Sequence, residues 1–445
     1  MLYITIIHPM KKYPIFRVVL AVLMLPLTAS AASFVVWPGQ SLQAAIDAAA
    51  AGDNITVQTG SYNENITITK GIDVRGVGGA VLVTGTLTVT EPALPVYLAD
   101  ISFGKSGASS MTLTGDGTQK VRMDRCKLVG GGDLNCNGMI AYFYKHQFDR
   151  NVDFTSSTWT FQRSSVAGSL TSTDCTAKFI ASSADNFAHR GDSAGELTLF
   201  QSSVWQFTDV TLPESVQGWI AYSTLRRVEL SGGVIEVVGN HFNGRDTQHN
   251  LLTLNDQCQS LIRNNLFWDD DSYRDAIWVG SSAGSTRIFN NTIRDVYRGI
   301  YIQGSPTAVE IRGNIHAEHS RGGQPSVRSD FSGTIIADNN FQYGIVGGVQ
   351  SGNINEDPFF RTGPDGQQWW LAPTSPSRNA GPENVIFNNI DGSRNDQGAY
   401  GGHSYDPTGR TTLKPVVLSG AVSPLYVKRG GAVTIKARAA VVAPE

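Results

Sequence analysis

Apolar and polar residues alternate over much of this chain, and in its second half the alternation recurs with a fixed period. Five asparagines mark that period, at intervals of 25, 26, 23 and 25 residues. These asparagines are Asn240, Asn265, Asn291, Asn314 and Asn339. Three positions before each lies a β-branched residue, and these are Val237, Ile262, Ile288, Ile311 and Ile336. The pattern therefore predicts a repeat whose units are built alike.

Each repeat favours strands over helices, because β-branched and aromatic residues dominate its apolar positions. A fixed period of this size is typical of repeat architectures. Short strands in a turn of about 25 residues are expected to form one coil of a parallel β-helix, with the apolar column inside and the asparagines bonded to one another along the axis. At this period, residues 54–350 would make about twelve coils. The predicted fold class is all-β.

One short helix is predicted before the first strands. Residues 41–50 begin with Ser41, a favourable N-cap, and end before Gly52. Its apolar face would comprise Leu42, Ala45, Ile46 and Ala49. The open end of a solenoid exposes a strand edge and a bare core, so we interpret this helix as the cover of that end.

Both ends of the repeat region match a known pattern. Residues 41–76 read SLQAAIDAAAAGDNITVQTGSYNENITITKGIDVRG, with Gly60-Ser61-Tyr62 followed by Glu64-Asn65. This stretch resembles the opening of the right-handed parallel β-helix proteins of the pectate-lyase-like superfamily. Residues 351–402, with Asp357-Pro358, Ser375-Pro376 and Gly398-Ala399-Tyr400, resemble the C-terminal cap of bacterial secreted members.

The resemblance implies a right-handed, single-stranded parallel β-helix with a short N-terminal capping helix. It does not imply one activity, because the superfamily includes lyases, hydrolases, epimerases and members without known chemistry. The expected organisation is a signal peptide (1–31), an N-terminal cap (32–53), the β-helix (54–350), a C-terminal cap (351–402), a linker (403–412) and the start of an incomplete immunoglobulin-like β-sandwich (413–445). The less regular residues 130–233 are expected to carry loops or insertions.

The N-terminus predicts export. Residues 1–31 combine Lys11, Lys12 and Arg17 with an apolar stretch and the small-residue cleavage site Ala29-Ser30-Ala31. We expect a bacterial protein that is extracellular, periplasmic or displayed at the cell surface. Without residues 1–31 the chain holds 32 basic and 38 acidic residues, and no basic stripe indicates nucleic acid. No further membrane span is predicted, and the sequence does not determine the oligomeric state.

Export would permit disulfides among the four cysteines. Cys126 and Cys136 lie ten residues apart across a glycine turn, so a local bridge between them is predicted. Cys175 and Cys258 are too far apart along the coils for a bridge. Cys126 also falls where the asparagine column would continue, which favours a buried side chain.

A second set of residues repeats at intervals of 25 and 24 residues. Its acidic members are Asp246, Asp271 and Asp295. Its cationic members, three positions later, are His249, Arg274 and Arg298. Its aromatic members, with two flanking tryptophans, are Tyr273, Tyr297, Trp268 and Trp278. With coils ~4.8 Å apart, three carboxylates would line up beside a strip of cationic side chains.

Such a strip suits chemistry on acidic polysaccharides. The three aspartates could share a calcium ion, and the two arginines and the histidine could remove a proton or stabilise charge. The four aromatic residues could bind sugar rings. Two carboxylates on either side of a sugar would instead serve a glycoside hydrolase. The alternative is that these are ordinary turn residues that repeat because the coils repeat.

Polysaccharide binding is the predicted function, with a calcium-assisted lyase of uronic-acid polymers or a glycoside hydrolase as alternatives. A non-catalytic stalk or adhesin is the third possibility. Two further histidine-containing segments, Lys145-His146 and His189-Arg190, are expected in solvated turns.

Overall fold

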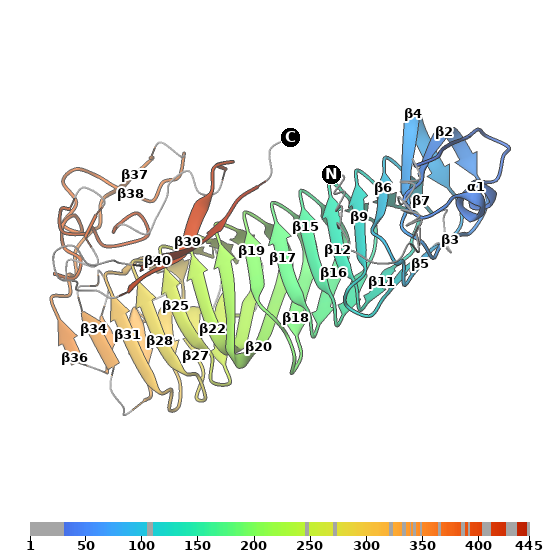
Figure 1. Cartoon of the computed structure of the whole chain (residues 1–445). Helices are drawn as coiled ribbons and strands as arrows, with labels where there is room; N and C mark the ends of the chain where they lie inside the picture. Colours follow the sequence, from blue (N-terminus) through green and yellow to red (C-terminus); the bar gives the residue numbers. More distant parts are fainter. Residues whose placement is uncertain are drawn as a thin grey trace, which may run out of the picture. The chain divides into compact units, whose positions relative to one another are not determined.

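The described part of the chain forms a parallel β-solenoid with one short helix, as the sequence predicts, and the solenoid has about 14 turns. Figure 1 shows the coils following one another in chain order from β4 to β36. The structure is a computed structural model. It describes residues 31–104, 110–244, 249–269, 274–319, 324–331, 335–338, 340, 344–347, 349–363, 366–383, 388–389, 392–402, 411–423 and 434–442.

Each coil contributes a strand to up to three parallel sheets. Sheet 1 contains β1 (Ser33–Val36), β2 (Asn54–Tyr62), β4 (Asp73–Val83), β6 (Val96–Ala99), β9 (Lys120–Asp124), β12 (Ile140–Tyr144), β15 (Thr158–Gln162), β17 (Thr176–Ile180), β19 (Leu197–Phe200), β25 (Gln259–Arg263), β28 (Ser285–Phe289), β31 (Ala308–Arg312), β34 (Ile335–Asp338) and β36 (Val349–Ser351). Sheet 2 contains β7 (Ser102–Phe103), β10 (Lys127–Leu128), β13 (Gln147–Phe148), β21 (Thr224–Leu225), β23 (His241–Asn243), β26 (Leu266–Trp268), β29 (Thr292–Val296) and β32 (Ile315–His319). Sheet 3 contains β3 (Ile66–Ile68), β5 (Leu87–Thr90), β8 (Met111–Thr114), β11 (Leu134–Asn137), β14 (Val152–Thr155), β24 (Leu252–Asn255), β27 (Asp275–Val279), β30 (Arg298–Ile302), β33 (Val327–Ser329) and β35 (Ile345–Val346).

Several long strands turn a corner and join more than one sheet. Besides β2 and β4, they are β16 (Ser165–Thr173), β18 (Ser183–Arg190), β20 (Ser203–Ala221) and β22 (Val228–Val238). Along the strands every second side chain points into the bore, which is why the apolar column is buried. Val237, Ile262, Ile288 and Ile311 are each 0% exposed.

The corner between sheets 1 and 2 is held by the predicted asparagine ladder. Asn265 Oδ1 accepts hydrogen bonds from the backbone N (2.9 Å) and from Nδ2 (3.0 Å) of Asn240, one coil earlier. Asn291 Nδ2 donates to the Ile262 carbonyl (3.0 Å), one coil back, so the residue three before each asparagine also supplies an acceptor. The ladder consists of Asn240, Asn265, Asn291, Asn314 and Asn340, and it ends on Asn353.

The prediction erred by one residue in the last repeat. Asn340, not Asn339, accepts from Asn314 at 3.0 Å, and Asn339 itself lies outside the described residues. Likewise Ile311 pairs with Ala337, so Ile336 is displaced from the apolar column. A spacing of 26 residues replaces the expected 25, because a coil can lengthen in a turn without disturbing its corner.

Serines continue the same corner in the earlier coils. Ser202 Oγ accepts from the backbone N of Ser182 at 3.3 Å, and Ser223 Oγ accepts from Ser202 N at 3.1 Å. Cys126 stands in this column, as predicted, because Lys127 pairs with Gln147 just after the corner. The residue before each corner position takes a left-handed conformation, with φ of 51° at Arg125 and Asn290.

The expectation of loops or insertions in residues 130–233 holds only locally, where residues 213–216 of β20 stand opposite a single residue of β22. The corner bonds there join residues only 17 to 21 positions apart, against 23 to 26 in the asparagine ladder. The coils are shorter, and this is why about twelve predicted coils become about 14 turns. These residues look irregular when they are aligned at a period of 25, because the coils here have a shorter period.

The predicted helix is present as α1 (Leu42–Ala48). Ser41 caps it by accepting from Ala44 N at 3.0 Å, and Glu64 of the first coil accepts from Leu42 N at 2.6 Å. Leu42 and Ile46 are each 1% exposed and belong to the solenoid core. The helix therefore covers the first coils, which fits its interpretation as an end cover.

Two antiparallel strand pairs follow the solenoid. The first pair is β37 (Phe360–Arg361) with β38 (Trp370–Leu371), within residues 351–402. The second pair is β39 (Val416–Ser423) with β40 (Thr434–Ala440). Val416, Ala440 and Val442 pack against an apolar cluster on the outside of the solenoid that includes Phe200 and Trp219. Membership of β39 and β40 in a larger sandwich stays a prediction.

The predicted disulfide between Cys126 and Cys136 is wrong. Each of the four cysteines is free and buried; Cys126 lies at the corner between sheets 1 and 2, whereas Cys136 lies on β11 in sheet 3. Burial raises the pKa of the thiols of Cys126, Cys136 and Cys258 to about 12.

The predicted signal peptide lies outside the described residues, apart from Ala31. Residues 403–410 of the predicted linker also lie outside them. Within the described part of the chain, no helix has the length and hydropathy needed to cross a membrane.

Candidate functional site

The outer face of sheet 3 presents one side chain from each of five consecutive coils in register. Strand pairing aligns Glu229 with Thr253, Thr253 with Trp278, Trp278 with Tyr301 and Tyr301 with Arg328. Adjacent members lie one coil apart, ~4.8 Å along the axis. A row of acidic, hydroxyl, aromatic and cationic groups thus follows the direction of stacking.

A pocket of about 300 Å³, which we call the sheet-3 groove, opens on this face. It is lined by Arg227, Glu229, His249, Asn250, Thr253, Arg274 and Trp278. Three of the residues predicted from the sequence, His249, Arg274 and Trp278, therefore meet here. His249 and Arg274 are exposed at its rim, whereas Thr253 is 9% exposed at its floor.

Two connections from sheet 2 to sheet 3 place the rim residues. His249 lies at the end of the connection after β23, and Arg274 lies at the end of the connection after β26. Asn250 Oδ1 accepts from Asp275 N at 3.2 Å, and Leu251, 1% exposed, donates its backbone N to the Asp275 carbonyl at 3.2 Å. These bonds lock the two connections side by side, so His249 and Arg274 come from neighbouring coils at the same edge.

The wall formed by Arg227 and Glu229 carries an ion pair between them. The Arg227 guanidinium also lies 4.6 Å from the centre of the Phe207 ring, which fixes its orientation. Because both partners are partly exposed, the pair contributes little to stability, and its value is in holding a cation and an anion at defined positions.

Asp209 stands one coil before Glu229 in the same row. Burial raises the pKa of the Asp209 carboxyl, and the neighbouring Glu229 carboxylate raises it further. The guanidinium groups of Arg190, 3.7 Å away, and Arg227 partly offset this rise. The two neighbouring carboxylates therefore have different surroundings: Asp209 is half-buried, and Glu229 is paired with Arg227.

Arg298 does not align with His249 and Arg274 as predicted. Strand register places it opposite Asp275, so Tyr297 is the residue that follows Arg274 in the column. Arg298 Nε donates to Asp275 Oδ1 at 2.5 Å and Nη2 donates to Oδ2 at 3.2 Å, while the Tyr301 ring lies 4.2 Å from the guanidinium. Burial raises the pKa of Asp275 and the Arg298 guanidinium lowers it. Arg298 neutralises a carboxylate whose side chain is 3% exposed.

The predicted calcium ligands are only partly described. Asp246, Asp271 and Tyr273 lie outside the described residues. Asp295, on β29 with φ of 56°, accepts from Trp268 Nε1 at 3.1 Å and lies 3.5 Å from Arg294 Nε. Among the residues that the structure describes, no three His, Cys, Asp or Glu side chains gather as metal ligands would. Calcium binding stays a prediction.

Trp268 lies apart from the groove. It packs beside Leu266, Trp369 and Ala399, where the segment after the solenoid meets sheet 2. Its pairing partner in the next coil is Arg294, not a residue of sheet 3. Of the two flanking tryptophans, Trp278 belongs to the groove and Trp268 to the contact with the C-terminal segment.

Sequence reasoning missed Arg227, Glu229 and Asp209, which complete the row. The 25-residue period hid them, because they stand in coils of 17 and 21 residues. A signal was available in the alternation of Val228, Glu229 and Leu230, which marks Glu229 as an outward residue of a strand.

The sequence matches no protein-family model and no curated protein. Solved structures share the fold distantly. The A-module of the Azotobacter vinelandii mannuronan C-5 epimerase AlgE4 matches with 14% identity and a TM-score of 0.32, over 71% of this chain and 93% of that one. The A-module of AlgE6 from the same organism matches with 14% identity and a TM-score of 0.33, over 71% and 91%.

A third structure, the PL6-family alginate lyase AlyGC, matches with 13% identity and a TM-score of 0.38. The match covers 77% of this chain and 57% of the lyase chain, so more than a third of the lyase has no counterpart here. Each of these is a similarity of coiled-strand fold.

Proposed function

We propose that this protein is a secreted or cell-surface polysaccharide-binding protein, and that a uronic-acid polymer lies along the sheet-3 groove. The observation that carries the proposal is the meeting of Arg274, His249 and Trp278 in one pocket on an outward strand face. Cationic groups suit the carboxylate of a uronic acid, and an indole suits the apolar face of a sugar ring.

The geometry of the row supports an extended ligand. Glu229, Thr253, Trp278, Tyr301 and Arg328 project from successive coils along one line. The coil spacing of ~4.8 Å is close to the length of one sugar unit, so a linear polymer can present successive units to successive coils. Hydroxyl, carboxylate and guanidinium groups in that row can accept from and donate to sugar hydroxyls.

Isothermal titration with a panel of uronic-acid hexasaccharides tests the proposal. Arg274→Ala removes a cation from the rim and should weaken binding about 10-fold, which corresponds to about 1.4 kcal/mol. Trp278→Ala should weaken it by a similar factor. The effect of Arg274→Ala should shrink as salt rises from about 0.05 to about 0.5 M, whereas the effect of Trp278→Ala should stay the same, because only Arg274 acts through charge.

The matched control is Arg125→Ala, an exposed arginine on a distant coil. Equal affinity of the wild type and both groove variants would remove the groove from consideration. Failure of every uronic hexasaccharide to bind would overturn the proposal as a whole and leave a structural stalk as the better account.

Hydrolysis is a second candidate function, favoured by one observation. Asp209 and Glu229 stand in register on adjacent coils, and the Asp209 pKa is raised while Glu229 is paired with Arg227. Glycosidases use two carboxyl groups whose surroundings differ, and this pair has one half-buried member and one member paired with an arginine. Release of reducing ends that is lost in both Asp209→Asn and Glu229→Gln would establish it.

Lyase chemistry has a different product and a separate assay. An unsaturated sugar product absorbs in the ultraviolet, so a calcium-dependent rise in absorbance that is lost in Arg274→Ala would identify a lyase. In that reaction His249 or Arg274 would remove the proton beside the uronate carboxyl. A flat trace with intact binding would leave the protein as a binder.

A further inference from the structure

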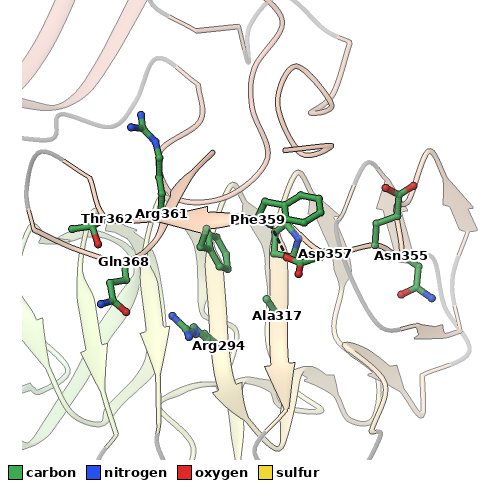
Figure 2. Close-up of a pocket in the computed structure, with 11 residues that line it drawn as sticks. Arg294, Ala317, Asn355, Asp357, Phe359, Arg361, Thr362 and Gln368 are labelled. Atoms are coloured by element: carbon green, nitrogen blue, oxygen red, sulfur yellow. Dashed lines mark hydrogen bonds between the residues drawn. The ribbon is translucent and has the colours of Figure 1, made fainter. Parts of the chain in front are cut away.

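A larger pocket lies on another side of the coil, between sheet 2 and the segment that follows the solenoid. Its volume is about 640 Å³, within the range of small-ligand sites. We call it the cap pocket. Figure 2 shows its lining residues as sticks, among them Arg294 from β29 and Ala317 from β32. They are Arg294, Ala317, Asn355, Glu356, Asp357, Pro358, Phe359, Phe360, Arg361, Thr362 and Gln368.

The floor exists because one coil carries a small residue. Strand pairing aligns Trp268 with Arg294 and Arg294 with Ala317, so a methyl group follows two large side chains in the same row. Ala317 is 2% exposed, and Phe360 packs beside it with Ile315. Phe360 takes the place beside Ala317 that a third large side chain would fill, and both residues line the pocket.

The upper wall holds an exposed aromatic ring in a fixed position. Phe359 is 49% exposed, and its backbone adopts φ of 48°, an uncommon conformation for a bulky residue. Two bonds maintain it: Phe359 N donates to Asp357 Oδ1 at 2.7 Å, and Ala372 N donates to the Phe359 carbonyl at 2.8 Å. In Figure 2 the Phe359 ring lies above Ala317, at the opening of the pocket.

Polar groups stand at both ends. Arg294 and Gln368 lie at one end and Asn355 at the other (Figure 2). The Arg294 guanidinium is oriented by Asp295, 3.5 Å from its Nε, and by the Trp369 ring, 5.8 Å away. The two amides supply donors and acceptors, and the guanidinium supplies donors whose direction is set by Asp295 and Trp369.

The charge of the cap pocket differs from that of the sheet-3 groove. The cap pocket has two arginines and two carboxylates, Glu356 and Asp357, so its formal charges cancel. The sheet-3 groove has two arginines, one histidine and one carboxylate, Glu229. A balanced set of donors and acceptors beside an aromatic face suits hydroxyl groups, whereas an excess of cations suits carboxylates.

We propose that the cap pocket is a second saccharide site and that it binds a neutral sugar unit. The ring of Phe359 covers the apolar face of the sugar, and Gln368, Arg294 and Asn355 bond its hydroxyl groups. This site uses none of the residues of the sheet-3 groove, so its existence does not depend on uronate binding there.

Isothermal titration with neutral hexasaccharides of glucose, mannose and galactose tests the inference. Gln368→Ala removes an exposed amide and should weaken binding of the hexasaccharide that the wild type takes by about 5-fold to 10-fold. Ala317→Leu displaces Phe360, which packs beside it in the pocket lining, and should abolish binding. Arg274→Ala, in the sheet-3 groove, should leave neutral-sugar affinity unchanged and serves as the matched control.

Three outcomes would overturn the inference. They are no binding of any of the three hexasaccharides at millimolar concentration, unchanged binding in Gln368→Ala, and loss of neutral-sugar binding in Arg274→Ala. Thermal melting followed by circular dichroism checks that Ala317→Leu folds. If that variant does not fold, the result for Gln368→Ala alone decides the inference. Uronate binding that is lost in Arg274→Ala and kept in Gln368→Ala supports the sheet-3 groove whatever the cap pocket does.

Discussion

The solenoid builds the same corner in two ways along its length. From His146 to Ser223 the corner position is mainly serine, and the coils hold 17 to 21 residues. From Asn240 to Asn340 it is asparagine, and the coils hold 23 to 26. We call these the serine half and the asparagine half.

The two kinds of side chain satisfy the same backbone groups, and the asparagine amides also bond to one another. Ser202 Oγ accepts the backbone N–H of Ser182 and lies within bonding distance of two carbonyls, that of Phe200 in its own coil (2.9 Å) and that of Phe179 in the previous coil (3.0 Å). Asn291 accepts the N–H of Asn265 and reaches back to the Ile262 carbonyl in the previous coil. The corner requires an acceptor for one buried N–H, and either residue type supplies it.

The extra residues of the asparagine half lie away from the corner. In the serine half β16 runs from sheet 2 into sheet 3 with only a local shift in register. In the asparagine half connections of several residues separate β23 from β24 and β26 from β27, and they carry His249 and Arg274. Longer coils therefore supply His249 and Arg274 to the candidate groove, while Arg227 and Glu229 come from a short coil.

The largest effect is expected from Arg298→Ala in the asparagine half. It leaves the carboxylate of Asp275, whose side chain is 3% exposed, buried without its cation, and should cost about 3 to 5 kcal/mol of unfolding free energy. Urea denaturation followed by circular dichroism measures it. Arg274→Ala, exposed and one residue before Asp275, is the control and should change stability by less than about 0.5 kcal/mol. Similar losses in both variants would contradict the structural role of Arg298.

The two corners should differ in sensitivity. Asn291→Ala removes acceptors for Asn265 N and Nδ2 and a donor to Ile262, and should cost about 3 kcal/mol. Ser202→Ala removes one acceptor and a shared donor, and should cost about 1 to 2 kcal/mol. Urea unfolding of the two variants side by side is the measurement. Equal costs would show that the corner N–H alone matters and that the amide ladder adds nothing.

Acid should destabilise the serine half through His146, which the sequence had placed in a solvated turn. The side chain is 1% exposed, its ring stacks on Phe148 at 4.1 Å, and burial lowers its pKa from 6.5 to about 3. The folded state resists protonation, so this contribution to stability is intact above pH 6.5 and declines as the pH falls toward 3.

His146→Phe removes that titration. When the pH falls from 7.5 to 4.5, the unfolding free energy of this variant should drop by about 2 to 3 kcal/mol less than that of the wild type. Urea unfolding at each pH measures the difference. Phe148→Leu disturbs the same packing without removing the imidazole and should keep the wild-type pH dependence. A pH profile of His146→Phe parallel to that of the wild type would show that His146 becomes protonated without cost.

The smallest effect is expected from Arg125→Ala, which breaks an ion pair with Asp100 near the start of the solenoid. Its two hydrogen bonds are short, 2.7 and 2.6 Å, but the side chains are 50% and 39% exposed. Water screens such a pair, so the loss should be below about 1 kcal/mol and should vanish in 1 M salt. If Arg125→Ala lowered the unfolding free energy as much as Arg298→Ala does, burial would not explain the difference between the two ion pairs.

Buried histidines show where local reasoning fails. His189 was also expected in a solvated turn, yet it is 0% exposed and bonds to Ser172 Oγ at 2.9 Å and to the Gly195 carbonyl at 3.1 Å. Trp159 Nε1 donates to the same Ser172 Oγ at 2.9 Å. His189 is thus satisfied by partners that its position in the sequence does not reveal, whereas His146 is buried among aromatic rings with no hydrogen-bond partner at either ring nitrogen among the described residues.

The sequence by itself determined the architecture, because the requirements of a coil are local and repeat. Alternation selects strands, the Asn240 to Asn314 spacing sets the coil, and Ser41 marks the covering helix. It also singled out His249, Arg274 and Trp278, since residues one period apart must become neighbours.

Only the tertiary structure decided register and partners. A shift of one residue moves a side chain to another column, and this is what joins Arg298 to Asp275 and puts Asn340 in place of Asn339. The cap pocket depends on a chain segment that returns to the face of sheet 2 after the solenoid ends. No period records such a contact, because its two sides are not repeats of one another.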